Sequence, residues 1–432
     1  MGVTIPRAVP SRAHAEEGGR KPSLLFVNQH YWPDVASTGQ HLTDLAEYLA
    51  ARGYDVHVLA SRGRYVKGRI PAPLRERRNG VEIHRVRTTG FGRARVAGRL
   101  VDYATFYFQV MWALLAGDHG RRYDHVVFLT TPPLLSFLGA IARLFGRQRY
   151  GVWSMDLHPD AEVASGMLAR AGLAARVLEW MHRVGLRHAD FIIDLGAHMK
   201  RRIVSKGVAP ERTHTVHVWN RREEVEPTER VANPLLDTLQ LRDRFVVMYS
   251  GNAGIVHEFG PILDAMRALR DEPRLFWLFV GDGPRRGEIE SHARDHAISN
   301  FRYREYFERD QLRYSLSVAD VHLISLRKEF VGISVPGKLY GIMASGRPAL
   351  FVGPRESDTG EAIIAANAGV VIDPGTGDAA TRLVAELRRL MSDPGLREAL
   401  GARGREAFLA RYEREENCAA FEQVLHRARV RR

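Results

Sequence analysis

The sequence predicts an α/β protein of two Rossmann-like domains, each with a parallel sheet, that face each other across a cleft. Three observations support this fold class. Short apolar runs alternate with longer amphipathic runs from residue 23 to residue 429. The 432 residues are too many for one ordinary hydrophobic core. A polar stretch with Pro227 and Pro234 interrupts the alternation near the middle of the chain, which is typical of a linker.

These observations divide the chain into five parts. We expect a disordered leader (1–21), an N-terminal domain (22–220), a linker (221–244), a C-terminal domain (245–413) and a last helix (414–432). Packing of the last helix back on the N-terminal domain is one option. The leader lacks the apolar centre of a signal peptide, and no run reaches the roughly eighteen uninterrupted apolar residues of a membrane-spanning helix.

The N-terminal half opens as a βαβ unit. A short apolar strand at 23–28 is followed by a polar loop, a helix at 39–52 with one apolar face, and a strand at 55–60. This order predicts a parallel sheet with the loop at the carboxyl ends of its strands. Further strands are predicted at 81–87, 124–130, 150–154 and 191–195, a closing segment at 216–219, and helices at 100–116, 134–145, 169–188 and from 197 onward.

The C-terminal half repeats the alternation. Apolar runs predict strands at 245–250, 275–280, 301–303, 321–325, 349–352 and 369–372. Helical periodicity is found at 259–269, after Pro284, at 309–317, from 336, and at 378–391, 394–411 and 414–429.

Composition limits the class of protein. Hydrophobic residues at 45% and charged residues at 26% are typical of soluble globular proteins. Cys418 is the only cysteine, which excludes an internal disulfide framework and a multi-cysteine metal site.

The formal charge of +13 is concentrated in one segment, because residues 61–100 hold twelve Lys or Arg against two Asp or Glu. Such a segment predicts an anionic surface partner, either a membrane face or nucleic acid. No RNA-binding pattern, helix-turn-helix or zinc spacing accompanies it, so nucleic acid is not expected. The strongly apolar helix at 100–116 has two interpretations, core packing or partial immersion in a membrane surface.

Polar residues gather at predicted strand ends in the first domain. Gly39 opens a helix that faces the expected cleft. Asp156, His158 and Asp160 follow the strand at 150–154, where an open α/β sheet places its chemistry. Helix capping and turn formation are the alternative roles of the two aspartates.

In the second domain, residues 334–338 begin a helix with Ser-Val-Pro-Gly-Lys. Proline is tolerated in a first turn, where its missing N–H would have had no partner. Free backbone N–H groups and the Lys338 ammonium are then directed at one point, which suits a phosphate or diphosphate. An ordinary loop, helix and strand with a solvated lysine is the alternative.

These pieces together resemble a known family. SGNAG at 250–254, FVGDGP at 279–284 and SVPGKLYGIMASGRP at 334–348 occur in the order found in family-four glycosyltransferases with the GT-B fold. Three further matches are the Thr38-Gly39 loop, WSMDLHPD at 153–160 and VWN at 218–220. The similarity spans nearly all of residues 22–425. It is nearest to the branch that builds bacterial surface polysaccharides, in which Pro-Ser/Gly-Lys-Leu replaces the usual acidic motif.

The resemblance implies a retaining transfer from a nucleotide diphosphate sugar, with no bound metal and no cofactor. The donor would lie on the C-terminal domain and the acceptor on the N-terminal domain, where Asp156, with His158 close behind, would meet the reacting sugar or the acceptor hydroxyl. The implied diphosphate contacts are the backbone near Gly251, Asn252 and Gly254, the turn Gly281, Asp282 and Gly283, the N–H groups around Ser334 and Val335, the Lys338 ammonium, and Gly39 from the first domain.

Two features depart from the family. Its usual pair of glutamates would fall on Ile333 and Gly341, which leaves Glu329 and Glu361 as candidates to hold the donor sugar or ribose. Its usual Arg and Lys after the first strand of the second domain are absent. Asn252 and His257 stand near that place, and His257 is equally interpretable as a surface helix residue.

We therefore expect a glycosyltransferase at the cytoplasmic face of a membrane, peripheral on it, acting on a lipid-linked or otherwise anionic acceptor in polysaccharide or glycolipid biosynthesis. The alternatives are a nucleotide-sugar epimerase or a phosphorylase of the same shape, a catalytically degenerate homologue, and a protein that binds anionic surfaces.

Overall fold

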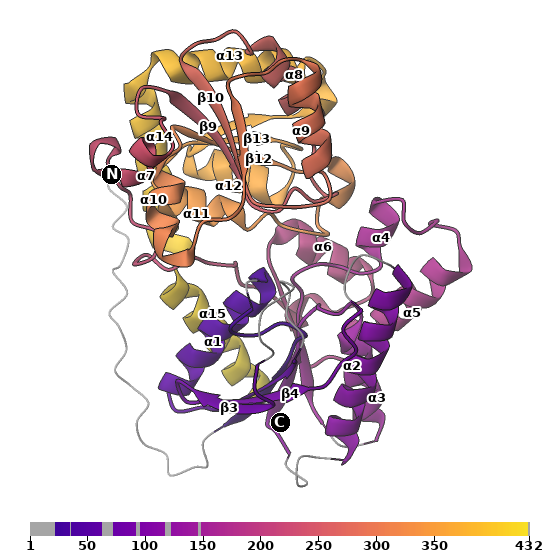
Figure 1. The fold of residues 1–432 in the computed structure, drawn as a ribbon. Coiled ribbons are helices and arrows are strands. Elements are labelled where there is room, and N and C mark those ends of the chain that lie inside the picture. Colours follow the sequence, from indigo (N-terminus) through magenta and orange to yellow (C-terminus); the bar gives the residue numbers. More distant parts are fainter. Residues whose placement is uncertain are drawn as a thin grey trace, which may run out of the picture.

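The computed structural model describes residues 22–34, 36–62, 72–91, 96–116, 122–145 and 148–430, and in these residues the chain forms two sheets, each the centre of one lobe (Figure 1). The predicted leader at 1–21 and two parts of the basic segment, 63–71 and 92–95, lie outside the described residues.

In the described part of the chain, the N-terminal sheet has eight strands in the order β3-β4-β2-β1-β5-β6-β7-β8. They are β1 (Ser23–Val27), β2 (Asp55–Ser61), β3 (Arg75–Arg78), β4 (Val81–Val86), β5 (His125–Phe128), β6 (Tyr150–Trp153), β7 (Phe191–Asp194) and β8 (Thr213–Thr215). β3 runs antiparallel to β4, and the other neighbouring strands are parallel. The direction in which successive strands are added to the sheet reverses between β1 and β5. At such a point the loops that follow the two strands diverge and leave a crevice at the carboxyl ends of the strands.

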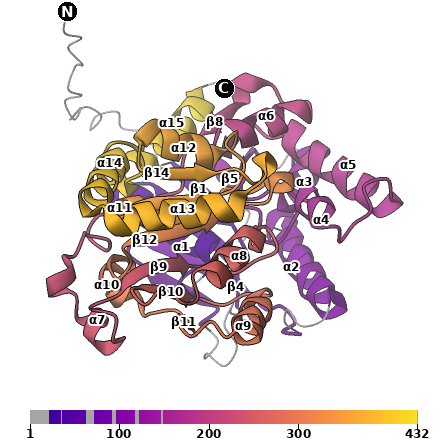
Figure 2. The ribbon, with the colours of Figure 1, turned by 90° about the horizontal axis from the view of Figure 1, so that it is seen from above.

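The helices of this lobe cover both faces of its sheet. They are α1 (Ser37–Ala51), α2 (Val96–Ala116), α3 (Leu135–Leu144), α4 (Asp160–Ala164), α5 (Leu173–Arg187) and α6 (Ala197–Ser205). α3 packs against both α2 and α5 on one side of the lobe. Seen from above, this side extends beyond the C-terminal lobe (Figure 2).

In the residues described, the C-terminal sheet has six parallel strands in the order β11-β10-β9-β12-β13-β14. They are β9 (Phe245–Ser250), β10 (Leu275–Val280), β11 (Phe301–Arg304), β12 (Val321–Ser325), β13 (Ala349–Val352) and β14 (Gly369–Ile372). Its longer helices are α8 (Gly260–Ala268), α9 (Arg286–Asp295), α12 (Asp358–Ala366), α13 (Ala379–Ser392) and α14 (Pro394–Arg411). Its shorter ones include α7 (Pro234–Thr238), α10 (Leu312–Ser317), α11 (Lys338–Ala344), η3 (Arg309–Gln311), η4 (Lys328–Phe330) and η5 (Pro374–Thr376). Both lobes are doubly wound, which confirms the predicted fold class.

The last helix, α15 (Arg414–Val430), returns to the N-terminal lobe (Figure 1). Phe421 packs with its ring centroid 6.3 Å from that of Phe26 and 5.0 Å from that of Trp153, so the helix completes the core under β1 and β6. The two lobes are therefore joined twice, once before β9 and once after α14.

Several elements differ from the prediction. β3 has the sequence RERR and lacks the apolar signal of a strand, because it is an edge strand whose side chains stay partly exposed. The sheet ends at β8, a strand of three residues that was not predicted and that directly precedes the closing segment at 216–219. The predicted linker contains α7, whose Leu235 and Leu236 are buried against Val246 and Met248 of β9. One turn with two leucines directly after Pro234 is too short to give a periodic signal.

Candidate active site

The glycine turns after β9 and β10 lie against each other. Gly251, Gly281 and Gly283 have φ angles of +131°, +137° and +144°, which residues with a Cβ atom rarely adopt. A Cβ at Gly281 would lie 2.3 Å from the carbonyl oxygen of Gly251, and one at Gly283 would lie 2.6 Å from the backbone of Ala253. The sequence predicted that these turns converge, and they do. Their glycines are required by this mutual packing, whatever ligand approaches them.

Lys338 reaches this pair of turns from the start of α11. Its Nζ atom lies 3.7 Å from the ring centroid of Tyr249, and a Cβ at Gly251 would lie 3.5 Å from the same atom. The Nζ atom is buried, and among the described residues it has no hydrogen-bond partner. Burial lowers the pKa of Lys338 well below its ordinary value. An unpartnered buried ammonium beside two backbone turns is a site that an anion would complete.

His257 also belongs to this cluster. The structure rules out the surface role that its sequence position allowed, because His257 is buried and its Nδ1 lies 2.7 Å from the carbonyl oxygen of Ser325. Burial, together with the nearby charge of Lys338, lowers the pKa of His257 to about 3. It is therefore a neutral wall of the site rather than a second cation.

Asp156 lies where the two lobes touch. It forms an isolated antiparallel bridge with Ser334, and the backbone N–H of the next residue, Leu157, donates to the carbonyl of Ile333 at 3.0 Å. Burial raises the pKa of Asp156, against the opposing effects of His158 and of a hydrogen bond with Ser334. Only four positions separate Ser334 from Lys338, so one short segment joins the candidate catalytic carboxylate to the anion site.

His158 is paired with a residue that the sequence reasoning missed. Its Nδ1 lies 2.8 Å from Oε1 of Glu162, one helical turn further on. Burial alone would lower the pKa of His158, but the hydrogen bond to Glu162 and the charges of Glu162, Asp156 and Asp160 raise it. The i, i+4 spacing of His158 and Glu162 across Pro159 was the available signal.

Asp160 lies beside Glu179 and His182. One ligand atom from each of the three lies within 4.8 Å of the others, a spacing that a metal ion could use. Buried Lys206 already occupies the centre, with Nζ 2.6 Å from Asp160 and 2.7 Å from Glu179. The cation of this cluster is a lysine. Asp160 acts in ion pairs with Lys206 and Arg202, and within the described residues no side-chain hydrogen bond caps α4, so the capping role considered as its alternative is not the one observed.

The remaining predicted residues lie outside the cluster. Gly39 packs closely on His30, since a Cβ there would lie 3.1 Å from the His30 carbonyl carbon. Glu361 is half exposed and pairs with His198 of α6 at 2.8 Å, across the junction of the lobes. Glu329 is exposed beside Arg327 at 3.5 Å. None of the three contacts the Gly251 turn or Lys338 in the interactions that the described residues make.

The implied backbone and polar contacts are only partly available. The N–H of Ser334 donates to the carbonyl of Phe330 at 3.3 Å, so it is already committed within the chain. Val335 is buried beside it. Asn252 and Asp282 are exposed at the tips of the two glycine turns, and the Asp282 carbonyl accepts from the N–H of Ala253 at 2.7 Å.

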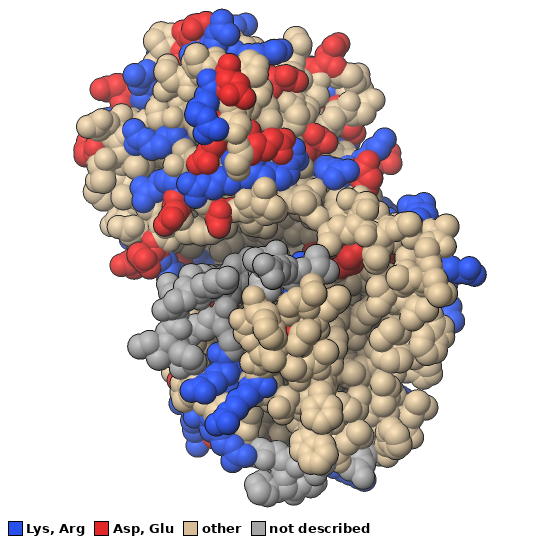
Figure 3. All heavy atoms as spheres, turned by 45° about the vertical axis from the view of Figure 1, so that its right-hand side comes forward, with Lys and Arg blue, Asp and Glu red and all other residues tan. Residues whose placement is uncertain are grey.

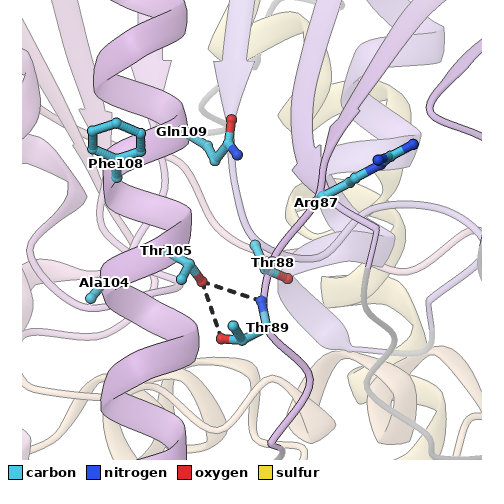
Figure 4. Close-up of a pocket in the computed structure, with 7 residues that line it drawn as sticks. All are labelled: Arg87, Thr88, Thr89, Ala104, Thr105, Phe108 and Gln109. Carbon is cyan, nitrogen blue, oxygen red and sulfur yellow. Dashed lines mark hydrogen bonds between the residues drawn. The ribbon is translucent and has the colours of Figure 1, made fainter.

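An open groove of about 530 Å³ lies elsewhere, on the N-terminal lobe (Figure 4). It runs between α2 and the residues that follow β4 and is lined by Arg87, Thr88, Thr89, Ala104, Thr105, Phe108 and Gln109. None of the predicted site residues lines it. Between the lobes themselves the molecular surface is hollowed (Figure 3).

The chain matches two family models that follow each other along it. Residues 38–219 match the Glycosyl transferase 4-like domain, and residues 238–407 match Glycosyl transferases group 1. The chain is 24% identical over 287 residues to the probable glycosyltransferase WbjE of Pseudomonas aeruginosa, covering 66% of this chain and 72% of that protein. It is 24% identical over 352 residues to the putative colanic acid biosynthesis glycosyl transferase WcaI of Escherichia coli (strain K12), covering 78% and 85%.

Solved structures share the fold. Sucrose-phosphate synthase of Thermosynechococcus elongatus superposes with a TM-score of 0.73 at 16% identity, over 95% of this chain and 100% of that one. Anabaena Alr3699/HepE, in complex with UDP and glucose, superposes with a TM-score of 0.68 at 14% identity, over 94% and 100%. At these identities the likeness establishes the two-lobed fold.

Proposed function

Because the chain belongs to the glycosyltransferases with the GT-B fold, we propose that it moves a sugar from a nucleotide diphosphate sugar to a lipid-linked or otherwise anionic acceptor. The reaction would retain the anomeric configuration and need neither a metal nor a cofactor. The observation that carries the proposal is the buried ammonium of Lys338, which has no hydrogen-bond partner in the described structure and faces the Gly251 turn.

The donor side of the proposal rests on charge. A diphosphate placed between Lys338 and the turns after β9 and β10 would give the ammonium the partner that it lacks. As the bond to the sugar breaks, negative charge grows on the leaving diphosphate, and a cation held in a site of low dielectric stabilises that charge strongly. The fold likeness to HepE, solved with UDP and glucose, supports a nucleotide-sugar donor.

The acceptor side rests on Asp156 and His158. Burial raises the pKa of Asp156, which makes its carboxylate a stronger proton acceptor than an exposed aspartate. We assign Asp156 to the acceptor hydroxyl or the reacting sugar. His158, whose pKa is raised by the hydrogen bond to Glu162 against the effect of burial, would in its protonated form donate a hydrogen bond beside it. Because Asp156 contacts Ser334 of the other lobe, its position depends on closure of the lobes.

A place in polysaccharide biosynthesis agrees with the similarity to WcaI. For such an acceptor we propose a peripheral position on the inner face of the plasma membrane. Within the residues that the structure describes, no helix is both long and apolar enough to cross a bilayer.

A thermal-shift screen with nucleoside diphosphates and nucleotide sugars tests the donor assignment. A ligand that binds only the native state raises the melting temperature, by an amount that reflects its affinity. We expect at least one nucleoside diphosphate to raise Tm in the wild type and to have little effect on Lys338→Met. If no member of the panel raises Tm at millimolar concentration, the donor assignment is wrong. Incubation with the best nucleotide sugar alone, without an acceptor, then checks for an epimer, which would indicate the epimerase alternative.

A further inference from the structure

Helix α2 exposes a stripe of large apolar side chains. Leu100, Phe108 and Trp112 are 58%, 69% and 64% exposed, and their spacing in multiples of four puts them on one side of the helix. The opposite side of α2 already supplies the core, where Phe106 and Val110 are fully buried. The helix therefore has two apolar faces, and packing within the lobe explains only one of them.

Helices α3 and α5 extend this surface. On α5, Leu173, Val177 and Trp180 are exposed at spacings of four and three residues. α3, which packs between α2 and α5, ends in exposed Leu144 and is followed by exposed Phe145. We call the exposed apolar side chains of α2, α3 and α5 the three-helix face. In Figure 3 the side of the N-terminal lobe that these helices form is a broad area of uncharged atoms with Lys and Arg at its margins.

The composition of the three-helix face favours a lipid surface over a protein partner. Scattered single apolar residues are normal on a monomer, but a contiguous patch with several aromatic side chains marks an interaction site. Tryptophan and phenylalanine are suited to the boundary between lipid headgroups and acyl chains. Exposed Arg87, Arg170 and Arg176 lie after β4, before α5 and on α5, where they could contact anionic headgroups.

The groove beside α2 gives the three-helix face a polar margin. Figure 4 shows Phe108 on one side of α2, directed away from the residues after β4, whereas Gln109 is directed toward them. Arg87 and Thr88 form the far edge of the groove. An apolar stripe with a cation and hydroxyls along one edge matches the depth profile of a bilayer surface, from acyl chain to headgroup.

The same helix lies close to the candidate catalytic pair. The charge of Arg99, at the start of α2, helps to lower the pKa of Glu162, and the charge of Glu162 helps to raise the pKa of Tyr107 on α2. Burial is the largest influence on both groups. It raises the pKa of Tyr107, and at Glu162 it opposes a net lowering of the pKa. These two charge effects show that α2 lies near the His158–Glu162 pair.

We infer that the three-helix face docks on the surface of an anionic lipid bilayer, with Phe108, Trp112 and Trp180 placed among the headgroups. The inference rests on the proposed function in one respect, since docking would bring the active site to a membrane-borne acceptor. The two remain separable, because the membrane contact lies on the N-terminal lobe and the nucleotide contact on the C-terminal lobe.

Vesicle flotation with the full chain tests the inference. The probes are vesicles of phosphatidylcholine alone and of phosphatidylcholine with phosphatidylglycerol. We expect the wild type to bind the anionic vesicles more strongly. Each of Phe108→Ser, Trp112→Ser and Trp180→Ser should lower the partition coefficient about tenfold, in line with the loss of one buried aromatic side chain. Val231→Ser, which removes a 78% exposed apolar side chain from the C-terminal lobe, is the matched control and should bind as the wild type does.

Three outcomes would overturn the inference. The first is a wild type that binds neither kind of vesicle. The second is a triple Ser variant that binds as well as Val231→Ser. The third is a wild type that is dimeric by light scattering while the triple variant is monomeric, which would make the face a contact between copies of the chain. The nucleoside diphosphate thermal shift is measured on every variant. If it persists while vesicle binding fails, only the docking inference falls, and the reverse result removes only the proposed function.

Discussion

Lys206 and Lys338 each have a buried side-chain nitrogen, and they differ in whether carboxylates pair with it. Lys206 lies within 2.7 Å of carboxylate oxygens from both Asp160 and Glu179. Lys338 lies over the ring of Tyr249, and no described residue accepts a hydrogen bond from its ammonium. A buried charge is tolerated when it is paired and costs free energy when it is not. The ion pairs of Lys206 lie within one lobe and belong to the fold, whereas the unpaired Lys338 is the residue that we propose binds a ligand.

The largest effect we expect on stability is at Lys206. Lys206→Met should lower the free energy of unfolding by about 3 kcal/mol, because two partly buried carboxylates lose their common partner. Urea denaturation measures the change, with the exposed Lys328→Met as control. Lys338→Met should leave the free energy of unfolding of the ligand-free protein unchanged or raise it, since methionine removes a buried amine that has no hydrogen-bond partner among the described residues. Equal losses at Lys206 and Lys338 would contradict the comparison.

Asp156→Asn should lower turnover about a hundredfold or more, which is typical of losing a group that accepts a proton in the reaction. The KM for the donor should change little. Burial raises the pKa of Asp156, so near neutral pH the ionised carboxylate costs the native state free energy that it does not cost the unfolded chain. The variant should therefore melt at a higher temperature near neutral pH, and this gain should vanish in acid. A selective loss of donor affinity would move Asp156 to the donor site.

His158 has one carboxylate partner, Glu162, whereas Lys206 has two and Lys338 has none among the described residues. Glu162→Gln should lower the pKa of His158, which NMR of the imidazole protons measures, and should shift the basic limb of the pH–rate profile to lower pH. Glu162→Asp is the conservative control. Equal pKa values of His158 in wild type and Glu162→Gln would exclude Glu162 as its positioning residue.

The same pair should contribute about 1 kcal/mol of stability within a limited pH window. The pair needs ionised Glu162, which is present above the ordinary glutamate pKa of about 4.3. It also needs protonated His158, whose stabilising effect is complete below about 6.5 and is lost as pH rises through its raised pKa in the folded state. The difference in unfolding free energy between wild type and Glu162→Gln should therefore be largest in mildly acidic solution. A difference that grows above neutral pH would contradict this assignment.

The smallest effect we expect is proton uptake on ligand binding. A diphosphate next to Lys338 would reverse the lowering of its pKa by burial, so binding should take up protons to the extent that the free amine is neutral. Calorimetry in two buffers with different ionisation enthalpies measures that uptake, and Lys338→Met should abolish it. Uptake of the same size in the variant would assign the proton to another group.

Local sequence signals predicted most of the fold. Wholly buried strands such as β1 and β10 form apolar runs bounded by turn residues, which is why their positions were predicted within a residue. The elements that were missed lack such a signal. β3 is a charged edge strand, and α7 is a single turn with two leucines directly after Pro234.

The candidate site was predictable where its residues follow adjacent strands of one sheet. The turns at Gly251 and Gly281 follow adjacent strands of one sheet, so their meeting follows from strand order. Partners that are distant in the sequence were not predictable. Only tertiary packing brings Ser334 to Asp156 and Lys206 to Glu179, and it also places Glu361 against His198. Residues that contact each other across the lobes have no characteristic spacing in the chain.

The affinity of Lys338→Met for a nucleoside diphosphate tests the central claim most directly. Isothermal titration calorimetry would use whichever of UDP, GDP or ADP gives the largest thermal shift with the wild type. Loss of a buried charge that meets the diphosphate should weaken binding by about 30-fold or more, while the free protein stays folded. A dissociation constant within about twofold of the wild-type value would show that the diphosphate does not meet Lys338, and the account of this site would be wrong.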